Sequence, residues 1–208
     1  MNCVLFENGR FAVLVKKAGE DSEGPGEGLL CVHRLDRPAG GLIVCAKDSA
    51  AAAELSAAFS GRKTKKEYLA VVCGIPAKEG RMEDLLFHDR RTNKTYIAKS
   101  VRKGVKKASL SYETLCTAEN EGKAFSLVRI RLETGRTHQI RVQFASRHLP
   151  LAGDGRYGST LRNCPLALWS HFLSFPSPGT GETVSFRLVP DVSVFPWSLF
   201  GEQLESLR

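Results

Sequence analysis

Residues 33–44 read HRLDRPAGGLIV, a charged turn that runs directly into an apolar strand. The carboxylate of Asp36 lies between two arginines, Arg34 and Arg37, and the apolar run predicts a short buried strand over residues 42–46. A carboxylate flanked by fixed positive charge stays ionised and is poised to act as a nucleophile or a base. The competing interpretation is a surface ion pair, with Asp36 as an ordinary turn or cap residue.

A second informative segment, TGRTHQIRV, occupies residues 134–142. Thr137 resembles a helix N-cap and predicts a helix from His138 to about Arg147. Arg141 then lies one turn into that helix, a rigid position for a planar cation that can hold a carboxylate by two parallel hydrogen bonds. Without its surrounding motif, Arg141 would be interpreted as an exposed helix arginine.

Together the two segments resemble the two signature motifs of the RluA-type RNA pseudouridine synthases. The resemblance extends from Phe11 to about Pro190, with the motifs in family order. It implies an α+β fold, in which a long bent mixed sheet, mostly antiparallel, is flanked by helices and loops around a central basic cleft. We expect a single catalytic domain over residues 1–208, with no S4-type RNA-binding domain ahead of it, because the first strand begins near Phe11.

The resemblance assigns three residues to the catalytic centre. Asp36 matches the catalytic aspartate, and Arg141 matches the arginine that pairs with it. Tyr68 matches the tyrosine that stacks on the flipped base, although strand tyrosines are more often half-buried core residues. The remaining candidates contact the substrate or brace the site: His33, Arg34, Arg37, Lys66, Arg136, His138 and Gln139. Of these, Arg34 matches the arginine that fills the gap left by the flipped base, and His33 is expected to bond the motif loop to its neighbours.

The charge of the chain favours a polyanionic partner. There are 30 Lys+Arg against 22 Asp+Glu, a net charge of +8. Residues 90–107 contain eight basic residues and no acidic one, which by itself equals the excess of the whole chain. A second cluster comprises Arg62, Lys63, Lys65 and Lys66. Concentrated basic charge is typical of a surface that follows phosphates, although each cluster taken alone could be a solvated loop.

Other regular elements follow from hydrophobic periodicity. Asp48 or Ser49 should cap a helix that continues to about Ser60 and stops at Gly61. The chain also contains apolar or alternating runs that predict strands: residues 11–15, 67–73, 95–100, 108–116, 124–133 and 183–188. Trp197, Leu199, Phe200 and Leu204 suggest a docked C-terminal piece. Many strands without regular βαβ alternation independently favour an α+β fold.

Cofactors and membranes are not expected. The six cysteines show no C-x-x-C pairing, so neither a disulfide framework nor a metal site is suggested. The isomerisation implied by the resemblance needs one ionised carboxylate and no cofactor. No leader peptide is recognisable, and no apolar run approaches the ~18–20 residues of a membrane span. We therefore expect a cytoplasmic protein, and a monomer because no oligomerisation stripe is evident.

The chain departs from the family pattern at several positions, and its spacer from Gly19 to His33 is short. Pro38-Ala39-Gly40 stands where the family usually has a segment with two hydroxyl side chains, so this chain lacks both hydroxyls. Lys17 stands where proline is usual, and Gln143 replaces a histidine. None of them changes the aspartate, the tyrosine or the second arginine. The loop geometry and the fit of the substrate are the properties that they affect.

Three hypotheses follow. The leading one is an RNA uridine isomerase acting on structured RNA, either ribosomal or transfer RNA. The second is an RNA-binding protein that keeps the fold with reduced catalysis, which the altered loop motivates. The third is a glycosidase-type hydrolase, which needs a second carboxylate ~5–10 Å from the first. Glu133 or Asp154 could supply that carboxylate, but Asp154 lies in a motif that resembles a structural turn.

Overall fold

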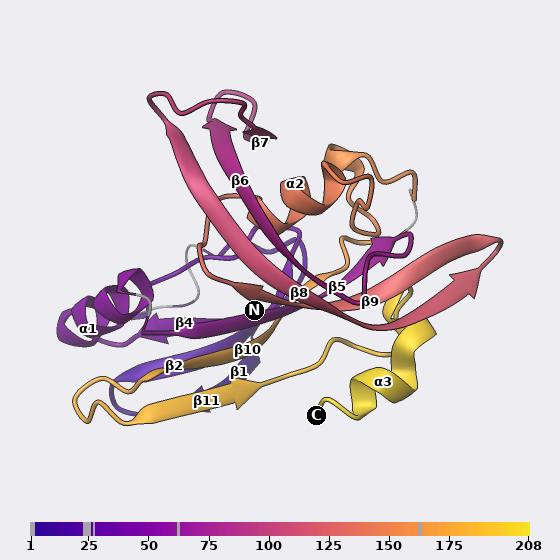
Figure 1. The fold of residues 1–208 in the computed structure, drawn as a ribbon. Coiled ribbons are helices and arrows are strands. Elements are labelled where there is room, and N and C mark those ends of the chain that lie inside the picture. Colours follow the sequence, from indigo (N-terminus) through magenta and orange to yellow (C-terminus); the bar gives the residue numbers. More distant parts are fainter. Residues whose placement is uncertain (1–2, 23–25, 27, 62, 162–163) are drawn as a thin grey trace. The chain divides into compact units, whose positions relative to one another are not determined.

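The computed structural model describes residues 3–22, 26, 28–61, 63–161 and 164–208. Within these residues the chain forms eleven strands and three α-helices (Figure 1). It divides into two compact units, Met1–Tyr68 with Leu168–Pro190 and Leu207–Arg208, and Leu69–Ala167 with Asp191–Ser206. The strand pairings within the units are mostly antiparallel and include a parallel one, which confirms the α+β class and the mixed, mostly antiparallel sheet.

The first unit is built on a central strand, β4, flanked by β2 and β10. β2 pairs antiparallel with both β1 and β4, whereas β10 runs parallel to β4 and antiparallel to β11. β3 pairs with the end of β4. The bounds of these strands are Cys3–Glu7 (β1), Phe11–Lys16 (β2), Leu30–Cys31 (β3), Gly40–Ala46 (β4), Leu168–Pro176 (β10) and Thr183–Arg187 (β11).

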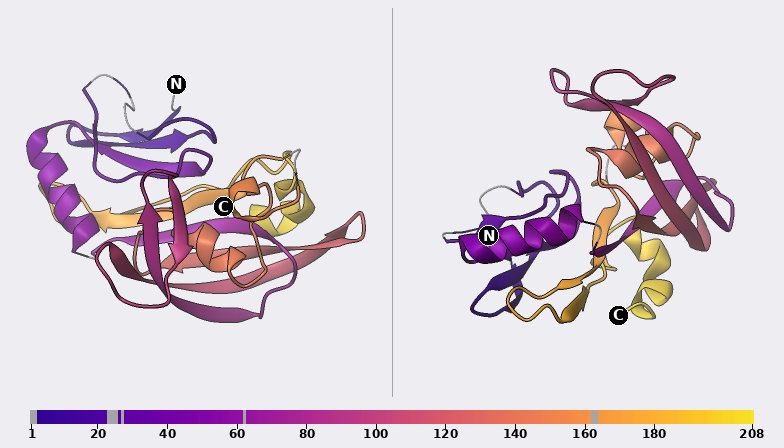
Figure 2. Two further views of the ribbon diagram at one scale, coloured as in Figure 1. Left: turned by 90° about the horizontal axis from the view of Figure 1, so that it is seen from above. Right: turned by 60° about the vertical axis from the view of Figure 1, so that its left-hand side comes forward.

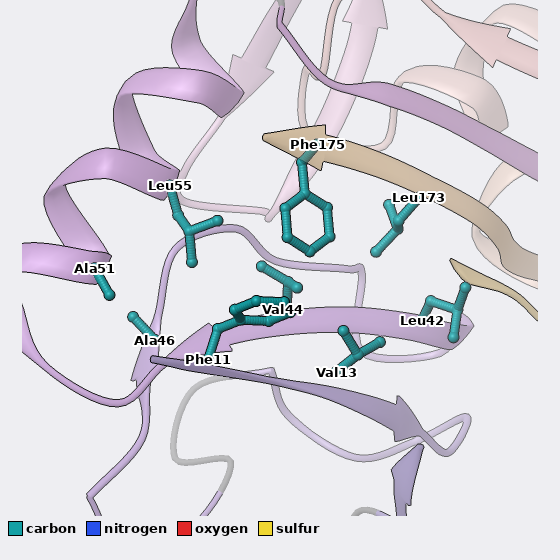
Figure 3. Packing of buried hydrophobic residues seen from close by; sticks show 9 residues of the cluster. All are labelled: Phe11, Val13, Leu42, Val44, Ala46, Ala51, Leu55, Leu173 and Phe175. Atoms are coloured by element: carbon teal, nitrogen blue, oxygen red, sulfur yellow. The ribbon is translucent and has the colours of Figure 1, made fainter. Parts of the chain in front are cut away.

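Helix α1 (Ser49–Ser60) covers one face of these strands, as the two further views show (Figure 2). Asp48 is its N-cap and accepts from the backbone N–H of Ala51 at 2.8 Å, as predicted. Ala51 points from the helix towards Ala46, and Leu55 points into the apolar core of the unit towards Val44 and Phe175 (Figure 3). The unit therefore has its own apolar core, which includes Leu42 and Val44 of the strand that follows Asp36.

Two glycines at the start of β4 permit the parallel contact with β10. Gly40 pairs with Trp169 and Gly41 with Ser170. A Cβ at Gly41, where φ is +111°, would lie 2.4 Å from the carbonyl oxygen of Ser170. A Cβ at Gly40 would lie 2.6 Å from the ring of Trp169. Only glycine fits at these positions, which explains the pair at the end of the charged turn.

The second unit contains the C-terminal part of β5 and a set of long antiparallel strands. β8 pairs with β6 on one side and with β9 on the other, and β6 also pairs with β7. β8 and β9 form a long hairpin (Figure 2). The strands are bounded by Lys65–Cys73 (β5), Glu79–Asp89 (β6), Lys94–Ile97 (β7), Val105–Asn120 (β8) and Lys123–Leu132 (β9).

Short helices complete the second unit. Val142 of α2 (Gln139–Ala145) and Tyr157 of the 3-10 helix Gly155–Tyr157 pack on Leu86 and Ala108 of the sheet. The C-terminal piece consists of the 3-10 helix Trp197–Phe200 and α3 (Gly201–Glu205). Its side chains Trp197, Phe200 and Leu204 are buried, so the predicted docked segment is confirmed.

Several expected boundaries were wrong. Thr137 is not the N-cap of α2: that position is His138, in the left-handed region at φ 53° and without a side-chain capping bond. The Thr137 carbonyl instead accepts the hydroxyl of Thr95. Helix α2 ends at Ala145 rather than Arg147, and β7 ends at Ile97 rather than Ser100.

Strands β1, β3, β6 and β10 were not predicted. β6 shows why, because its sequence, EGRMEDLLFHD, is rich in residues that are poor strand formers. Its pairing with β8 from Glu79 to Phe87 supplies the stabilisation that local propensity lacks. Tertiary pairing therefore overrides propensity in this strand.

Candidate active site

Asp36 lies in a tight turn between β3 and β4 and is half-buried. Its carbonyl oxygen accepts from the backbone N–H of Ala39 at 2.9 Å, which closes the turn over Arg37 and Pro38. The following residues, Ala39 and Gly40, are buried. The turn therefore holds the Asp36 backbone against the core of the first unit.

The side chain of Lys16 holds this turn by hydrogen bonds to its backbone carbonyl oxygens. The residue is fully buried, and its ammonium donates to the carbonyl oxygens of Ala39 at 2.7 Å, Arg37 at 2.9 Å and Lys17 at 3.0 Å. Burial lowers the pKa of Lys16, while nearby carboxylates, including that of Asp36, raise it. The sequence analysis did not identify Lys16, which ends an apolar strand and is followed by a second lysine.

Replacing Lys16 with methionine should loosen the Asp36 turn. Three carbonyl oxygens would lose their donor, so we expect Lys16→Met to lower the free energy of unfolding by about 1–3 kcal/mol. Chemical denaturation measures this change. Lys17→Met is the matched control, because the side chain of Lys17 is exposed beside the same turn. Equal losses in the two variants would contradict a supporting role for Lys16.

His33 fixes the start of the motif segment. Its Nε2 accepts from the backbone N–H of Val44 at 3.0 Å, and its ring stacks on Phe59 with centroids 4.4 Å apart. Burial, followed by the charge of Lys66, lowers the pKa of His33 to about 3. His33 is thus a neutral hydrogen-bond acceptor that bonds the motif loop to β4, the structural contact expected from the sequence.

The depressed pKa of His33 should make stability depend on pH. In the unfolded chain the imidazole of His33 has its ordinary pKa of about 6.5. The folded protein keeps it neutral down to about 3. Between these values the unfolded state binds more protons, so the free energy of unfolding falls as the pH is lowered, by up to about 1.4 kcal/mol per pH unit.

Denaturation between these pH values tests this dependence. We expect a flatter pH profile for His33→Asn than for the wild type. His148→Asn serves as the control, because His148 is exposed and belongs to the other unit. Parallel profiles for wild type and His33→Asn would show that His33 does not titrate differently on folding.

Tyr68 belongs to β5 and is buried, with 8% of its surface exposed. Burial raises the pKa of its hydroxyl, and the negative charge of Asp36 raises it further. The phenol therefore stays protonated and can act as a flat platform or a hydrogen-bond donor. This effect of the Asp36 charge on the pKa of Tyr68 indicates that the two side chains are close within the first unit.

The other candidates of the first unit are two arginines and a lysine. Arg34 is exposed, and Arg37 is exposed with its Nε donating to the carbonyl of Gly19 at 2.9 Å. Lys66 is half-buried, with its ammonium 5.4 Å from the centre of the Phe59 ring, and burial lowers its pKa. Arg62 of the same basic cluster lies outside the described residues.

Arg141 of α2 forms a buried ion pair with Asp154. Its Nε and Nη2 each donate at 2.8 Å to one carboxylate oxygen, and the two side chains are 5% and 1% exposed. This two-bond geometry fixes the plane of the guanidinium. The sequence placed Asp154 in a structural turn or as a possible second carboxylate, and this pairing with Arg141 was not predicted. Because both Asp154 oxygens hold Arg141, Asp154 is poorly suited to be the second carboxylate of a hydrolase.

A hydrogen-bonded chain braces the start of α2. The Tyr157 hydroxyl accepts from the backbone N–H of Thr95 at 2.8 Å and lies 2.9 Å from Nδ1 of buried His138. Gln139 is also buried: its Oε1 accepts from the Thr134 hydroxyl at 2.7 Å, and its Nε2 donates to the Ser109 carbonyl. These two candidates therefore hold the loop ahead of Arg141.

Arg136 lines a basic pocket in the second unit. Its Nε donates to the carbonyl of Lys107, and the side chain is exposed. The pocket has a volume of about 400 Å³. Arg90 and Lys106 add positive charge, and the described residues that line the pocket include no carboxylate. Two of these cations come from the basic segment at residues 90–107, and the pocket is a suitable size for an anionic group.

Neither a metal centre nor a membrane helix is evident in the part of the chain that the structure describes. No group of three or more His, Cys, Asp or Glu residues there could hold a metal ion. No helix among the same residues is long and apolar enough to cross a membrane.

Comparisons with known proteins show which sequences and folds this chain resembles. The profile of a family described as RNA pseudouridylate synthase matches residues 13–146. Ribosomal large subunit pseudouridine synthase D of Neisseria meningitidis serogroup A is 36% identical over 192 residues, covering 86% of this chain and 49% of the relative. Ribosomal large subunit pseudouridine synthase D of Pasteurella multocida is 40% identical over 131 residues, covering 63% of this chain and 38% of that relative.

A solved structure shows the same fold. Human RNA Pseudouridylate Synthase Domain Containing 1 superposes with a TM-score of 0.79 at 23% identity, covering 95% of this chain and 86% of that one. The chain spans about half the length of the curated relatives that it matches.

Proposed function

Because the chain belongs to the RNA pseudouridylate synthase family, we propose that it converts uridines of a structured RNA to pseudouridine. In this reaction the N-glycosidic bond of the uridine breaks, the base turns, and a carbon of the base bonds to C1′ in place of the nitrogen. The target nucleotide has to leave its RNA helix to reach the protein, a step that costs a few kcal/mol, roughly, in unstacking and unpairing.

Asp36 is the carboxylate that we assign to this chemistry. It can attack the ribose or the base, or remove a ribose proton, and each route needs an ionised and oriented carboxylate. The observation that carries the proposal is the turn itself. Lys16 holds its carbonyl oxygens, and the Asp36 charge acts on the buried Tyr68 within the same unit.

Tyr68 and Arg141 complete the proposed centre. The flat ring of Tyr68 is suited to stacking on a uracil base. The guanidinium of Arg141, oriented by Asp154, is proposed to pair with Asp36 and fix its direction. Arg34 is proposed to occupy the space that the flipped base leaves, in keeping with its exposed position beside the turn.

Ribosomal RNA is the substrate that we propose first. Relatives at 36% and 40% identity are named as ribosomal large subunit pseudouridine synthases, and transfer RNA is the alternative. We further propose that residues 1–208 act as a single catalytic domain and as a cytoplasmic monomer. Sedimentation of the purified protein tests the monomer, because a dimer would double the molar mass.

Mapping pseudouridines tests the activity directly. The purified protein is incubated with unmodified transcripts of ribosomal RNA and, separately, of transfer RNA. Carbodiimide treatment then marks pseudouridines as reverse-transcription stops. New stops at one or a few uridines of one RNA would support the proposal and name the substrate. Tight RNA binding without any new stop would favour the RNA-binding hypothesis, and release of free uracil would favour the hydrolase.

The basic pocket gives a separate prediction for RNA binding. If Lys106 contacts a phosphate, Lys106→Gln should reduce the slope of log affinity against log salt by roughly 1. The loss should be similar for RNAs of different sequence, because a phosphate contact carries no base information. Filter binding at several salt concentrations measures it. Lys78→Gln is the control, since Lys78 is exposed in the same unit but outside the basic segment; equal slopes for both variants would exclude Lys106 as a contact.

A further inference from the structure

Two cysteines of the first unit face each other across neighbouring strands. Cys31 of β3 and Cys45 of β4 are direct partners in the antiparallel register. Partners in a ladder project their side chains to the same face of the sheet. Cys31 is exposed, whereas Cys45 is fully buried. One thiol is therefore open to reagents in solution, and the second lies directly behind it.

The backbone hydrogen bonds of β4 show whether Cys31 and Cys45 are a hydrogen-bonded or a non-hydrogen-bonded pair of the ladder. The backbone N–H of Lys47 bonds to the carbonyl of Arg10 beyond β2, whereas the N–H of Val44 points the other way, to His33. Because these directions alternate along a strand, the backbone N–H and C=O of Cys45 point towards β2 and away from β3. Cys31 and Cys45 are therefore a non-hydrogen-bonded pair, the closer of the two classes.

This geometry fits a disulfide. Cα atoms of a non-hydrogen-bonded pair lie about 4.5 Å apart. Disulfides usually join Cα atoms separated by about 4.4–6.8 Å. The separation expected for this pair therefore lies within the range that a disulfide spans. Cys45 is enclosed by Ala12, Leu14 and Ile43, which keep it facing the outer thiol.

We propose that Cys31 and Cys45 form an oxidisable pair that reacts with a low-molecular-weight disulfide, RS–SR, to give an intramolecular disulfide. The exposed Cys31 thiolate attacks one sulfur of RS–SR, which forms a mixed disulfide and releases one RSH after proton uptake. The Cys45 thiolate then attacks the Cys31 sulfur, forms the Cys31–Cys45 bond and expels the second RSH. Two protein thiols are oxidised and one RS–SR is reduced.

The disulfide would close a ring around the segment that carries Asp36. Its formation removes the S–H of Cys31, which donates to the carbonyl of Ser22. The Ser22 hydroxyl in turn bonds both the N–H and the C=O of Leu35, the residue before Asp36. Oxidation therefore acts on the supports of the Asp36 turn. Disulfide formation does not depend on the proposed RNA reaction, so the two proposals are tested by separate experiments.

Burial governs the speed of the second step. It raises the pKa of Cys45 to about 12, and the neighbouring Cys31 thiol adds to the rise. Below that value the thiolate fraction grows about tenfold per pH unit. Ring closure should therefore be slow near neutral pH and become faster as the pH rises.

Oxidation by glutathione disulfide tests the proposal. The intact protein is treated at about pH 7 and about pH 9, then analysed by mass spectrometry before and after dithiothreitol. We expect a glutathione adduct at Cys31 first, followed by a product lighter by two hydrogens that forms faster at the higher pH. Peptide mapping without reduction should link the peptides of Cys31 and Cys45.

Three variants show which thiols take part in the reaction. Cys31→Ser should abolish the linked product, and Cys3→Ser, which removes another exposed thiol of the same unit, should leave it unchanged. Cys45→Ser should stop the reaction at the glutathione adduct. A stable adduct on Cys31 in the wild type at both pH values, or a linked product joining other cysteines, would overturn the proposal.

Discussion

Asp36→Asn should abolish pseudouridine formation while leaving RNA binding almost unchanged. Asparagine keeps the shape of the side chain but can neither attack the ribose or base nor accept a proton as a carboxylate does. Loss of such a central group typically costs several orders of magnitude, so we expect turnover to fall by roughly 10³-fold or more. The basic pocket and the basic segment are untouched, and RNA affinity should change by less than about twofold, well under 1 kcal/mol.

Single-turnover assays with the RNA identified by mapping, together with filter binding, separate these two effects. Asp21→Asn is the matched control, because Asp21 is an exposed carboxylate of the same unit that pairs with Arg37 at 3.7 Å. Its loss should leave turnover close to that of the wild type. An Asp36→Asn protein that still forms pseudouridine at the wild-type rate would remove Asp36 from the mechanism.

Asp154→Asn should have the largest effect on stability. The change removes the carboxylate that accepts from both Nε and Nη2 of the buried Arg141. Breaking a buried ion pair from one side leaves a desolvated charge poorly compensated, so we expect the free energy of unfolding to fall by about 3–5 kcal/mol. Turnover should fall as well, because the guanidinium loses the partner that orients it.

Urea denaturation measures the stability change. Glu83→Gln is the control, because Glu83 pairs with Arg81 on the surface, where the side chains are 66% and 59% exposed. A surface pair of this kind contributes at most about 1 kcal/mol. A loss of stability in Asp154→Asn no larger than in Glu83→Gln would show that Asp154 is not essential to the buried pair.

Local patterns predicted the elements whose residues determine their own structure. The helix from Ser49 to Ser60 was expected because Asp48 caps it and small and apolar residues fill its inner face. The regular alternation of residues 124–133 predicted β9 to within a residue at each end. In these cases local propensity and the final environment agree, so sequence and structure give the same answer.

Elements that depend on distant partners were not visible in the sequence. β6 carries a strongly charged sequence and forms because β8 pairs along it. The start of α2 was misassigned because the Thr95 hydroxyl takes the carbonyl of Thr137, and His138 adopts a left-handed conformation. Such contacts join residues far apart in the chain, and no local pattern encodes them.

The sequence by itself identified the motif around Asp36, the family and the concentration of basic charge, because these depend on residue types at short spacings. Only the tertiary structure revealed that the Lys16 ammonium holds the Asp36 turn and that Asp154 orients Arg141. It also placed Cys31 opposite Cys45. The physical reason is the same in each case: a buried charge or thiol acquires its role from the groups that folding brings within bonding distance, and those groups are remote in sequence.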